Sequence, residues 1–395
     1  LYVTHHRRLK TIARSEAWAR ELSRRGYSVT LMCLGDAERW RTLEYERDGI
    51  HWVETPDLFW GRLRSGWDPI SAIRRIRWLR GRQYDLIHCF ETRPATIFPA
   101  LRHVRRQPTP LAMDWNDWWG RGGLITVNRP RWYQIAFGGI ETFFEEHYRV
   151  RADLTTVISR ALAERAAGLG VPRQSIHCIR GGVDVSLFMK TDSATARAQL
   201  GLPANDILLA YIGRDVNYDM PLIMNALKKA RQRDPAIRLV LVGNRPPNWS
   251  RILREYGSSE GITHLGLVPF AKIPEVLAAA DICLLPLSDV PANRGGWPHK
   301  LGDYMAAGRP FVANPVGDVG LFMRQEGVGW PAEDHPESFA QAILTLSANP
   351  ALRAELGAAS RRVAERVLTW QAVADQVEAC YRTLSGVSGR WKAHP

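Results

Sequence analysis

Residues 294–310, Arg-Gly-Gly-Trp-Pro-His-Lys-Leu-Gly-Asp-Tyr-Met-Ala-Ala-Gly-Arg-Pro, combine a glycine pair, a helix start and two opposite charges at a fixed spacing. The glycines at 295 and 296 allow the backbone to approach a ligand closely, and a helix that starts at Pro298 offers unpaired N–H groups to an anion. Lys300 and Asp303 share a face of that helix, where one can neutralise phosphate and the other can accept hydroxyl hydrogen bonds. A nucleotide sugar presents both groups.

The segment 300–310, together with Gly181-Gly-Val-Asp184 and Phe188, resembles the retaining nucleotide-sugar glycosyltransferases of the GT-B fold, close to glycosyltransferase family 4 (glycosyl transferases group 1). The resemblance implies two Rossmann-like α/β domains that face each other across a cleft, and a C-terminal helix that crosses back to the first domain. It also implies that Asp303 holds the ribose hydroxyls of the donor. The family has a second glutamate eight residues upstream, where this chain has Gly295, so the donor sugar stays open.

Short apolar runs alternate with helical patterns along the chain, as expected for parallel β-α-β units. The expected strands of the first half are Leu1–Thr4, Ser28–Leu34, Leu86–Cys89, Leu111–Met113, Leu154–Ile158 and Ile176–Ile179. Those of the second half are Ile207–Ile212, Arg238–Val242, Ile262–Leu265, Ile282–Leu285 and Phe311–Ala313. With the roles that the resemblance implies, we expect an acceptor-binding domain over residues 1–183, a nucleotide-sugar domain over 184–368, and a helix within 369–395 that packs on the first domain.

Turns that follow the expected strands of the second half add candidate donor contacts, because ligands of open α/β sheets bind at the carboxyl ends of strands. Arg214 could neutralise the diphosphate leaving group. The complete set of expected donor contacts is Gly213, Arg214, Gly243, Arg245, Val268, Gly295, Gly296, Trp297, Lys300, Leu301 and Asp303. For the strand-end residues among them, an ordinary surface turn is the alternative interpretation.

Residues 114–123, Asp-Trp-Asn-Asp-Trp-Trp-Gly-Arg-Gly-Gly, follow an expected strand and form the strongest acceptor candidate. Acids beside aromatic rings are typical of carbohydrate sites, so Asp114 or Asp117 could orient the acceptor hydroxyl as a catalytic group. The alternative is a loop pinned by buried tryptophans, with solvated acids. His6, just after the first expected strand, is a further catalytic candidate, although a histidine in a turn is more often structural.

Composition is that of a large globular enzyme rather than a disordered or membrane-spanning chain. The 395 residues are 45% hydrophobic and 24% charged, and the five cysteines are scattered without zinc-type spacing. No apolar run reaches the roughly 18 residues that span a bilayer, and the N-terminus has a strand pattern where a signal peptide would have a charged start. We therefore expect a cytoplasmic protein.

Charge is concentrated in the first half of the chain. Residues 1–190 carry 31 Lys and Arg against 20 Asp and Glu, a net charge of +11, whereas residues 191–395 carry 22 against 20, a net charge of +2. The arginines of the most basic stretch are Arg62, Arg64, Arg74, Arg75, Arg77, Arg80 and Arg82, interleaved with Trp60, Trp67 and Trp78. This pattern suits a peripheral contact with anionic lipid, although a solvated Arg-rich helix is equally compatible. No nucleic-acid motif accompanies the charge.

These observations favour a glycosyltransferase that moves a sugar from a nucleotide sugar to a sugar or glycolipid hydroxyl in cell-surface polysaccharide or glycolipid synthesis. We expect no cofactor and no metal, because no metal-ligand cluster of the Asp-x-Asp kind follows a strand. Retention of configuration is implied by the resemblance. Two alternatives stay open: a sugar-nucleotide epimerase of the same fold, and a non-catalytic nucleotide-sugar-binding scaffold.

Overall fold

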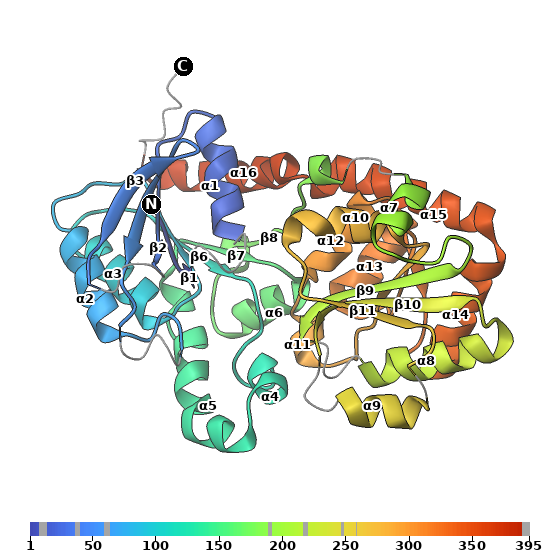
Figure 1. The fold of residues 1–395 in the computed structure, drawn as a ribbon. Coiled ribbons are helices and arrows are strands. Elements are labelled where there is room, and N and C mark those ends of the chain that lie inside the picture. The colour runs from blue at the N-terminus through green and yellow to red at the C-terminus, as the bar shows by residue number, and fades with distance from the viewer. Residues whose placement is uncertain are drawn as a thin grey trace. The chain divides into compact units, whose positions relative to one another are not determined.

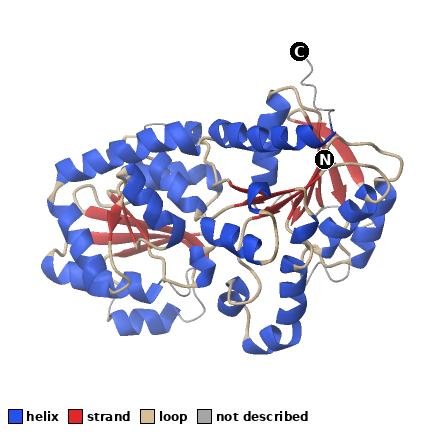
Figure 2. Cartoon of the chain, turned by 180° about the vertical axis from the view of Figure 1, so that it is seen from behind, coloured by secondary structure: helices blue, strands red, loops and turns tan. Residues whose placement is uncertain are grey.

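The computed structural model describes residues 1–7, 14–35, 40–58, 64–188, 192–215, 220–245, 249–257 and 259–388 (Figure 1). The chain divides into two compact units. Unit 1 is Leu1–Arg180 with the segment that begins at Trp370, and unit 2 is Gly181–Thr369. Each unit contains one mainly parallel β-sheet with helices packed along its faces (Figure 2). The α/β fold class with two sheets, predicted from the alternating patterns, is therefore confirmed.

The sheet of unit 1 has eight strands in the order β3-β4-β2-β1-β5-β6-β7-β8. They are β1 (Tyr2–Arg7), β2 (Val29–Leu34), β3 (Leu43–Arg47), β4 (Ile50–Thr55), β5 (Ile87–Phe90), β6 (Leu111–Trp115), β7 (Leu154–Val157) and β8 (Ile176–Cys178). Neighbouring strands are parallel except for β3 and β4. Since β2 lies on one side of β1 and β5 on the other, the strand order switches direction between β1 and β5.

β3 and β4 form an antiparallel hairpin that the sequence analysis did not predict. Asp48 and Gly49 make its turn, with φ angles of 56° and 73°. An Asp-Gly pair with two positive φ angles is the preferred chemistry of a two-residue hairpin turn. The Asp-Gly pair at residues 48–49 was therefore a sequence signal for this hairpin. It lies between two short strands that lack the long apolar runs of the central sheet.

The helices of unit 1 are α1 (Arg14–Arg24), α2 (Pro69–Trp78), α3 (Pro94–Val104), α4 (Leu124–Asn128), α5 (Arg131–Glu146), α6 (Arg160–Gly168) and α16 (Trp370–Ser388). α16 packs on α1 although the two lie at opposite ends of the chain (Figure 1). Val373 and Val377 of α16 share a hydrophobic core with Trp18 of α1. The hydroxyls of Tyr2 and Tyr381 lie 2.8 Å apart. The last helix is therefore part of the core of unit 1.

The sheet of unit 2 is entirely parallel, in the order β11-β10-β9-β12-β13-β14. Its strands are β9 (Ile207–Asp215), β10 (Ile237–Asn244), β11 (Ile262–Gly266), β12 (Ile282–Leu285), β13 (Phe311–Ala313) and β14 (Trp330–Pro331). Its helices are α7 (Ser193–Gln199), α8 (Met220–Arg233), α9 (Trp249–Tyr256), α10 (Ile273–Ala279), α11 (Pro291–Arg294), α12 (His299–Ala306), α13 (Gly317–Glu326), α14 (Pro336–Ala348) and α15 (Pro350–Val363). The expected strands are present, and β14 is an addition at the edge.

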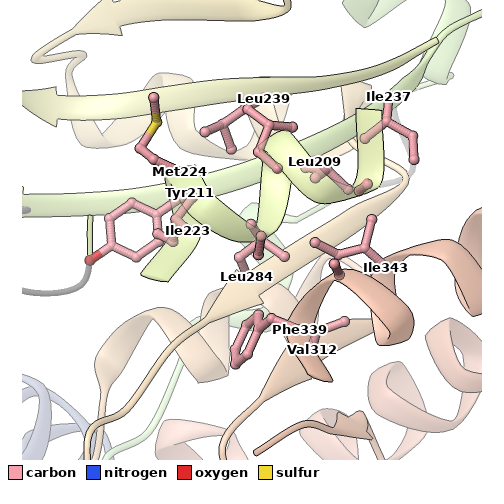
Figure 3. Close-up of a cluster of buried hydrophobic side chains, with 14 of the residues drawn as sticks. Leu209, Tyr211, Ile223, Met224, Ile237, Leu239, Leu284, Val312, Phe339 and Ile343 are labelled. Carbon is pink, nitrogen blue, oxygen red and sulfur yellow. The ribbon is translucent and has the colours of Figure 1, made fainter. Parts of the chain in front are cut away.

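The core of unit 2 lies between this sheet and helices α8 and α14 (Figure 3). Leu209 and Leu239 from neighbouring strands meet Ile223 of α8, and Phe339 and Ile343 of α14 fill the same cluster. Burial of aliphatic and aromatic groups of this size is the main stabilising contribution to such a domain. The core fixes the strands whose carboxyl ends carry the site described next.

Candidate functional site

Helix α12 lies at the point where the strand order of unit 2 switches direction, between β9 and β12. Tyr304 of α12 is fully buried, and its hydroxyl accepts a hydrogen bond from the Ile212 N–H of β9 (3.1 Å). The same hydroxyl donates to the Leu284 carbonyl of β12 (3.2 Å). Ligands of open α/β sheets bind outside the carboxyl ends of strands at such a switch. Tyr304 therefore holds α12 at the place where a ligand is expected.

The helix has the ends that the sequence predicts. α12 begins at His299 after Pro298, which takes an extended conformation, and it ends at Ala306. Gly308 follows with a φ of 65°, a left-handed conformation that glycine adopts without strain, and its N–H bonds to the Met305 carbonyl. The helix interior consequently places Lys300 and Asp303 on the same short element.

Lys300 is held against an aromatic ring of the core. Its ammonium lies 4.0 Å from the centre of the Tyr211 ring, in a cation–π contact. Gly213 sits beside the same ring, since a Cβ at this position would approach the Tyr211 Cε1 to 3.0 Å. The lack of a side chain at Gly213 therefore leaves room for the Tyr211 ring, against which the Lys300 ammonium lies.

Asp303 is a desolvated carboxyl without a compensating cation. It is partly buried, and this burial is the only cause that raises its pKa from 3.8 to about 7. Within the described residues, no ion pair involves its side chain. A carboxyl in this condition favours ligands that donate hydrogen bonds to it, because such bonds stabilise its charged form. The pair of Lys300 and Asp303 can therefore receive a phosphate and a hydroxyl-bearing group.

The glycine pair differs from the open cradle expected from the sequence. The N–H of Gly295 donates to the Pro291 carbonyl (2.8 Å), and the N–H of Gly296 donates to the Asn293 carbonyl (3.2 Å). Both amides therefore close the last turn of α11, because the chain turns sharply between α11 and α12. A bound diphosphate would have to compete with these two bonds.

Two expected donor contacts have their side chains in the core. Leu301 is fully buried, and Trp297 packs edge-to-face on Phe322 of α13 with ring centres 5.1 Å apart. Their apolar groups fix α12 rather than face solvent, because helix α12 needs a buried face to remain attached to the sheet. Their role at the site is that of support.

The remaining expected contacts follow other strands. Gly243, the residue before the last of β10, has a φ of 139°, and the exposed Arg245 donates a hydrogen bond to His264 (3.3 Å). Val268 follows β11 and is half-buried. The side chain of Arg214 lies outside the described part of the chain. These positions lie on the β10 and β11 side of the switch, next to β9.

A second group of polar side chains lies at the strand-order switch of unit 1, at the carboxyl ends of β1, β5 and β6. We call these residues the strand-end cluster: His5, His6, Glu91, Arg93 and Asp117. Within the described residues, neither this cluster nor any other contains three His, Cys, Asp or Glu side chains arranged to hold a metal ion.

Glu91 of the strand-end cluster was missed by the sequence analysis. It has a φ of 68°, which is unusual for a residue with a side chain and marks strain at a functional position in many proteins. Desolvation raises the pKa of its carboxyl to about 7, and Asp117 adds to the rise, whereas Arg149 and Arg93 oppose it. Its Oε1 accepts the Asn116 N–H at 3.1 Å. The sequence did carry a signal for Glu91, because this residue directly follows β5, a strand at the switch in strand order.

The three expected catalytic residues have different surroundings. Asp114 is 1% exposed, and its carboxylate bonds to Thr156 (2.6 Å) and forms a buried ion pair with Arg14 (3.2 Å). Asp117 is exposed, although desolvation by the protein around it raises its pKa, against the effect of Arg93. His6 is half-buried, with Nδ1 3.1 Å from the Thr4 hydroxyl. The geometry gives Asp117 and His6 access to a ligand and ties Asp114 into the core.

Hydrogen bonds to α5 hold the loop that carries Asp117 in place. Glu145 of α5 accepts hydrogen bonds from the Trp115 indole and the Trp119 N–H, each at 2.9 Å, and from the Gly120 N–H. Trp115 is fully buried. Glu141 of α5 also accepts a hydrogen bond from the Trp119 indole. The buried Trp115 agrees with the alternative interpretation of a loop pinned by buried tryptophans, but the sequence did not indicate the two glutamates of α5.

Part of the basic stretch expected to contact lipid is structural. Arg75 is fully buried and donates to Thr55, to the Thr4 carbonyl and to the Ala95 carbonyl, at 2.8–2.9 Å. Arg64 pairs with Glu141 of α5. Arg75 and Arg64 are therefore not part of an exposed basic face, which corrects the expectation for these two residues. An arginine can donate hydrogen bonds to several carbonyls inside a fold. Trp60 and Arg62 lie outside the described residues.

Comparisons with known proteins agree with this architecture. The chain is 28% identical over 217 residues to a D-inositol 3-phosphate glycosyltransferase of Segniliparus rotundus, covering 53% of this chain and 47% of that protein. A second protein of that name, from Rhodococcus erythropolis, is 26% identical over 243 residues, covering 58% of this chain and 52% of that protein. The chain thus spans about half the length of the curated relatives it matches.

Among solved structures, sucrose-phosphate synthase from Thermosynechococcus elongatus has a TM-score of 0.75 at 20% identity, covering 98% of this chain and 99% of that one. Anabaena HepE in complex with UDP-glucose has a TM-score of 0.69 at 17% identity, covering 98% and 99%. At these sequence identities, the two structural similarities support a shared fold only.

Two family models match consecutive parts of the chain. Glycosyltransferase Family 4 matches residues 15–187, and Glycosyl transferases group 1 matches residues 206–349. The first match lies almost entirely in unit 1 and the second lies within unit 2. The chain therefore belongs to the group 1, family 4 glycosyltransferases of the GT-B fold.

Proposed function

We propose that the chain transfers a sugar from a nucleoside diphosphate sugar to a hydroxyl group of an acceptor. The observation that carries this proposal is the desolvated carboxyl of Asp303 on the same helix as Lys300, at the switch in strand order of unit 2. Asp303 accepts the ribose hydroxyls and the Lys300 ammonium neutralises the diphosphate. The relatives named D-inositol 3-phosphate glycosyltransferase support glycosyl transfer, and the UDP-glucose complex of HepE makes a uridine diphosphate sugar the first donor to test.

The proposed reaction needs no metal, because the leaving diphosphate meets the Lys300 ammonium and the positive end of α12. The bond between the anomeric carbon and the phosphate oxygen breaks, and a bond to the acceptor oxygen forms on the same face of the sugar. The departing phosphate oxygen takes the proton of the acceptor hydroxyl. Retention of configuration is supported by the family resemblance alone.

The acceptor side of the proposal is the strand-end cluster of unit 1. Glu91 and Asp117 supply carboxylates that accept hydrogen bonds from sugar hydroxyls, and Arg93 supplies a positive charge beside them. We further propose a role in cell-surface polysaccharide or glycolipid synthesis at the cytoplasmic face of a membrane. The basic character of the first half of the chain supports this setting.

Calorimetry with UDP-, GDP- and ADP-sugars tests donor binding. We expect micromolar to millimolar affinity for one nucleotide class, and a loss of at least tenfold in Asp303→Asn. Glu355→Gln, an exposed carboxyl on α15, is the matched control and should bind like the wild type. Unchanged affinity in Asp303→Asn contradicts the proposal.

Turnover then separates the candidate functions. A transferase consumes donor only when a hydroxyl acceptor is present, and the anomeric configuration of the product is read by NMR. An epimerase converts the donor without any acceptor. A scaffold binds the donor and leaves it intact across the acceptor panel. Activity in excess EDTA checks the metal-independent form of the proposal.

A further inference from the structure

Helix α5 presents apolar side chains to solvent along one face. We call this face the outer stripe: Trp132, Ile135, Ala136, Gly139, Ile140 and Phe143. These positions recur at intervals of three and four residues, which places them on the same side of a helix. Trp132 is 65% exposed and Ile135 is 79% exposed. α4 and α5 project together from unit 1 (Figure 1).

The acidic side chains of α5 point the other way. Glu141 is 3% exposed and accepts hydrogen bonds from Arg64, from the Trp119 indole and from the Tyr133 hydroxyl (2.5 Å). Glu145 is also buried and fastens the loop of residues 115–120. Rotating α5 to bury the outer stripe would break these bonds and leave buried charges without partners. The outward position of the apolar face is therefore fixed by the polar core beneath it.

Cationic side chains surround the outer stripe. Arg121, Arg131 and Arg151 are exposed, and we call them the arginine rim. Glu146, the remaining acid of α5, is paired with Arg165. The exposed charge around the outer stripe is consequently positive.

A groove of about 710 Å³ adjoins the outer stripe and combines both kinds of side chain. Arg121, His147 and Arg151 contribute polar groups to its lining, together with Glu146, which is paired with Arg165. Ile125, Phe143 and Val150 contribute apolar surface to the same groove. A ligand with an anionic head and an apolar body matches this lining, as a lipid does.

We propose that the outer stripe and the arginine rim dock this protein on an anionic membrane surface, with α5 lying in the interfacial plane. An exposed tryptophan and aliphatic groups beside arginines are the side chains that such an interface binds. No helix among the described residues is long and apolar enough to cross a membrane. A second copy of the chain is a poorer occupant, because pairing two outer stripes would bring two arginine rims together.

The proposal is tested by co-sedimentation of the full chain with vesicles, without donor or acceptor, so that its outcome is independent of sugar transfer. One set of vesicles is pure phosphatidylcholine, and the other contains one quarter phosphatidylglycerol. We expect at least tenfold tighter binding to the anionic vesicles, and a decrease of this binding as NaCl rises from 0.05 to 0.5 M. Equal binding to both vesicle types overturns the proposal.

Variants locate the contact. Trp132→Ser/Ile135→Ser/Phe143→Ser and, separately, Arg121→Gln/Arg131→Gln should each weaken binding to anionic vesicles at least tenfold. Trp40→Ser and Ile73→Ser are matched controls, because Trp40 is 66% exposed and Ile73 is 48% exposed elsewhere in unit 1. The controls should bind like the wild type. Loss of binding in Ile73→Ser, on the basic helix α2, with full binding of the α5 variants, would assign the contact to α2 and overturn the proposal.

Two further measurements keep the result decisive. If the triple variant has a lowered Tm, hydrogen exchange of the wild-type chain replaces it, and we expect protection of residues 131–143 when anionic vesicles are added. Absence of that protection overturns the proposal. Light scattering after size exclusion measures self-association. A dimer that becomes a monomer in the triple variant, with vesicle binding unchanged, would assign the outer stripe to a second copy.

Discussion

The ammonium of Lys300 lies 4.0 Å from the centre of the Tyr211 ring. Tyr211 is 1% exposed and belongs to the same core as Leu209 and Leu239 (Figure 3). Because this ring is packed on the strands of unit 2, the cation that it supports is positioned by the core and not by a surface loop. A charge placed in this way loses little conformational entropy when a ligand binds to it.

Replacing Lys300 with Met keeps the length and the apolar stem of the side chain and removes its charge. We expect Lys300→Met to lower the affinity for UDP at least tenfold, which is about 1.4 kcal/mol. Its affinity for uridine, which has no phosphate, should be unchanged. Calorimetry with both ligands checks this, with Lys228→Met on the exposed side of α8 as the control. An equal loss for uridine and UDP contradicts a phosphate contact.

Asp303 should destabilise the ligand-free protein above acidic pH. Its folded pKa of about 7 exceeds the ordinary value of 3.8, so the folded state loses stability as the pH rises from about 4 to about 7. Asp303→Asn removes this loss. We expect a Tm advantage for the variant that grows between pH 5 and 7 and is constant above pH 7, reaching a few degrees at pH 8. A Tm difference that does not depend on pH would show that the carboxyl titrates normally.

Donor binding should release a proton near neutral pH. Ribose hydroxyls that donate to Asp303 favour its charged form, so binding lowers the pKa of this carboxyl from about 7. We expect up to one proton to be released per donor bound at pH 6.5, and less at pH 8, where the free carboxyl is already ionised. Calorimetry in two buffers with different ionisation enthalpies measures the number. Asp303→Asn should release none from this position.

Strong apolar runs made most of the fold predictable from the sequence. The strands at Ile207–Ile212, Arg238–Val242 and Ile282–Leu285 were found because parallel strands buried on both faces read as continuous apolar segments. The ends of α12 were found because proline and glycine mark helix boundaries through their own backbone geometry. The β3–β4 hairpin was missed, since its edge strand β3 is largely exposed and has a weak apolar pattern.

The candidate site was only partly predictable, because burial and backbone conformation are three-dimensional properties. Nothing in the sequence distinguishes Asp114, which is tied to Arg14, from Asp117, which is exposed. The positive φ of Glu91 cannot be read from residue types. Arg75 resembles its exposed neighbours along the chain, yet three carbonyl and hydroxyl oxygens hold it inside.

Glu91 should control the pH dependence of transfer. Its carboxyl has a pKa raised to about 7 by desolvation, and the charged form accepts a hydrogen bond from an acceptor hydroxyl more strongly than the protonated form does. We expect kcat/KM for the acceptor to rise as the pH increases through 7, and this rise to disappear in Glu91→Gln together with a loss of about 100-fold. Donor affinity should stay the same. Glu164→Gln, an exposed carboxyl of α6, is the control. A retained pH profile in Glu91→Gln would falsify this role.

Breaking the Arg14–Asp114 ion pair should lower the stability of the folded protein. Both side chains are almost completely buried and lie 3.2 Å apart. Removing one partner leaves the other charge buried, which costs about 3–5 kcal/mol. We therefore expect Arg14→Met to lower the free energy of unfolding by that amount in urea titrations. Arg20→Met, whose partner Glu16 lies one turn earlier on α1 and is likewise only partly buried, should cost about 1 kcal/mol or less.

Glu141 and Glu145 connect α5 with the loop of residues 115–120 in unit 1. Their carboxylates join α5 to the segment that runs from Trp115 to Gly120, and Asp117 lies within that segment. A displacement of α5 would consequently also displace Asp117, because hydrogen bonds link α5 to the loop and no long flexible segment lies between them. A surface that holds α5 would therefore also fix the position of Asp117, the carboxylate that we propose to face the acceptor.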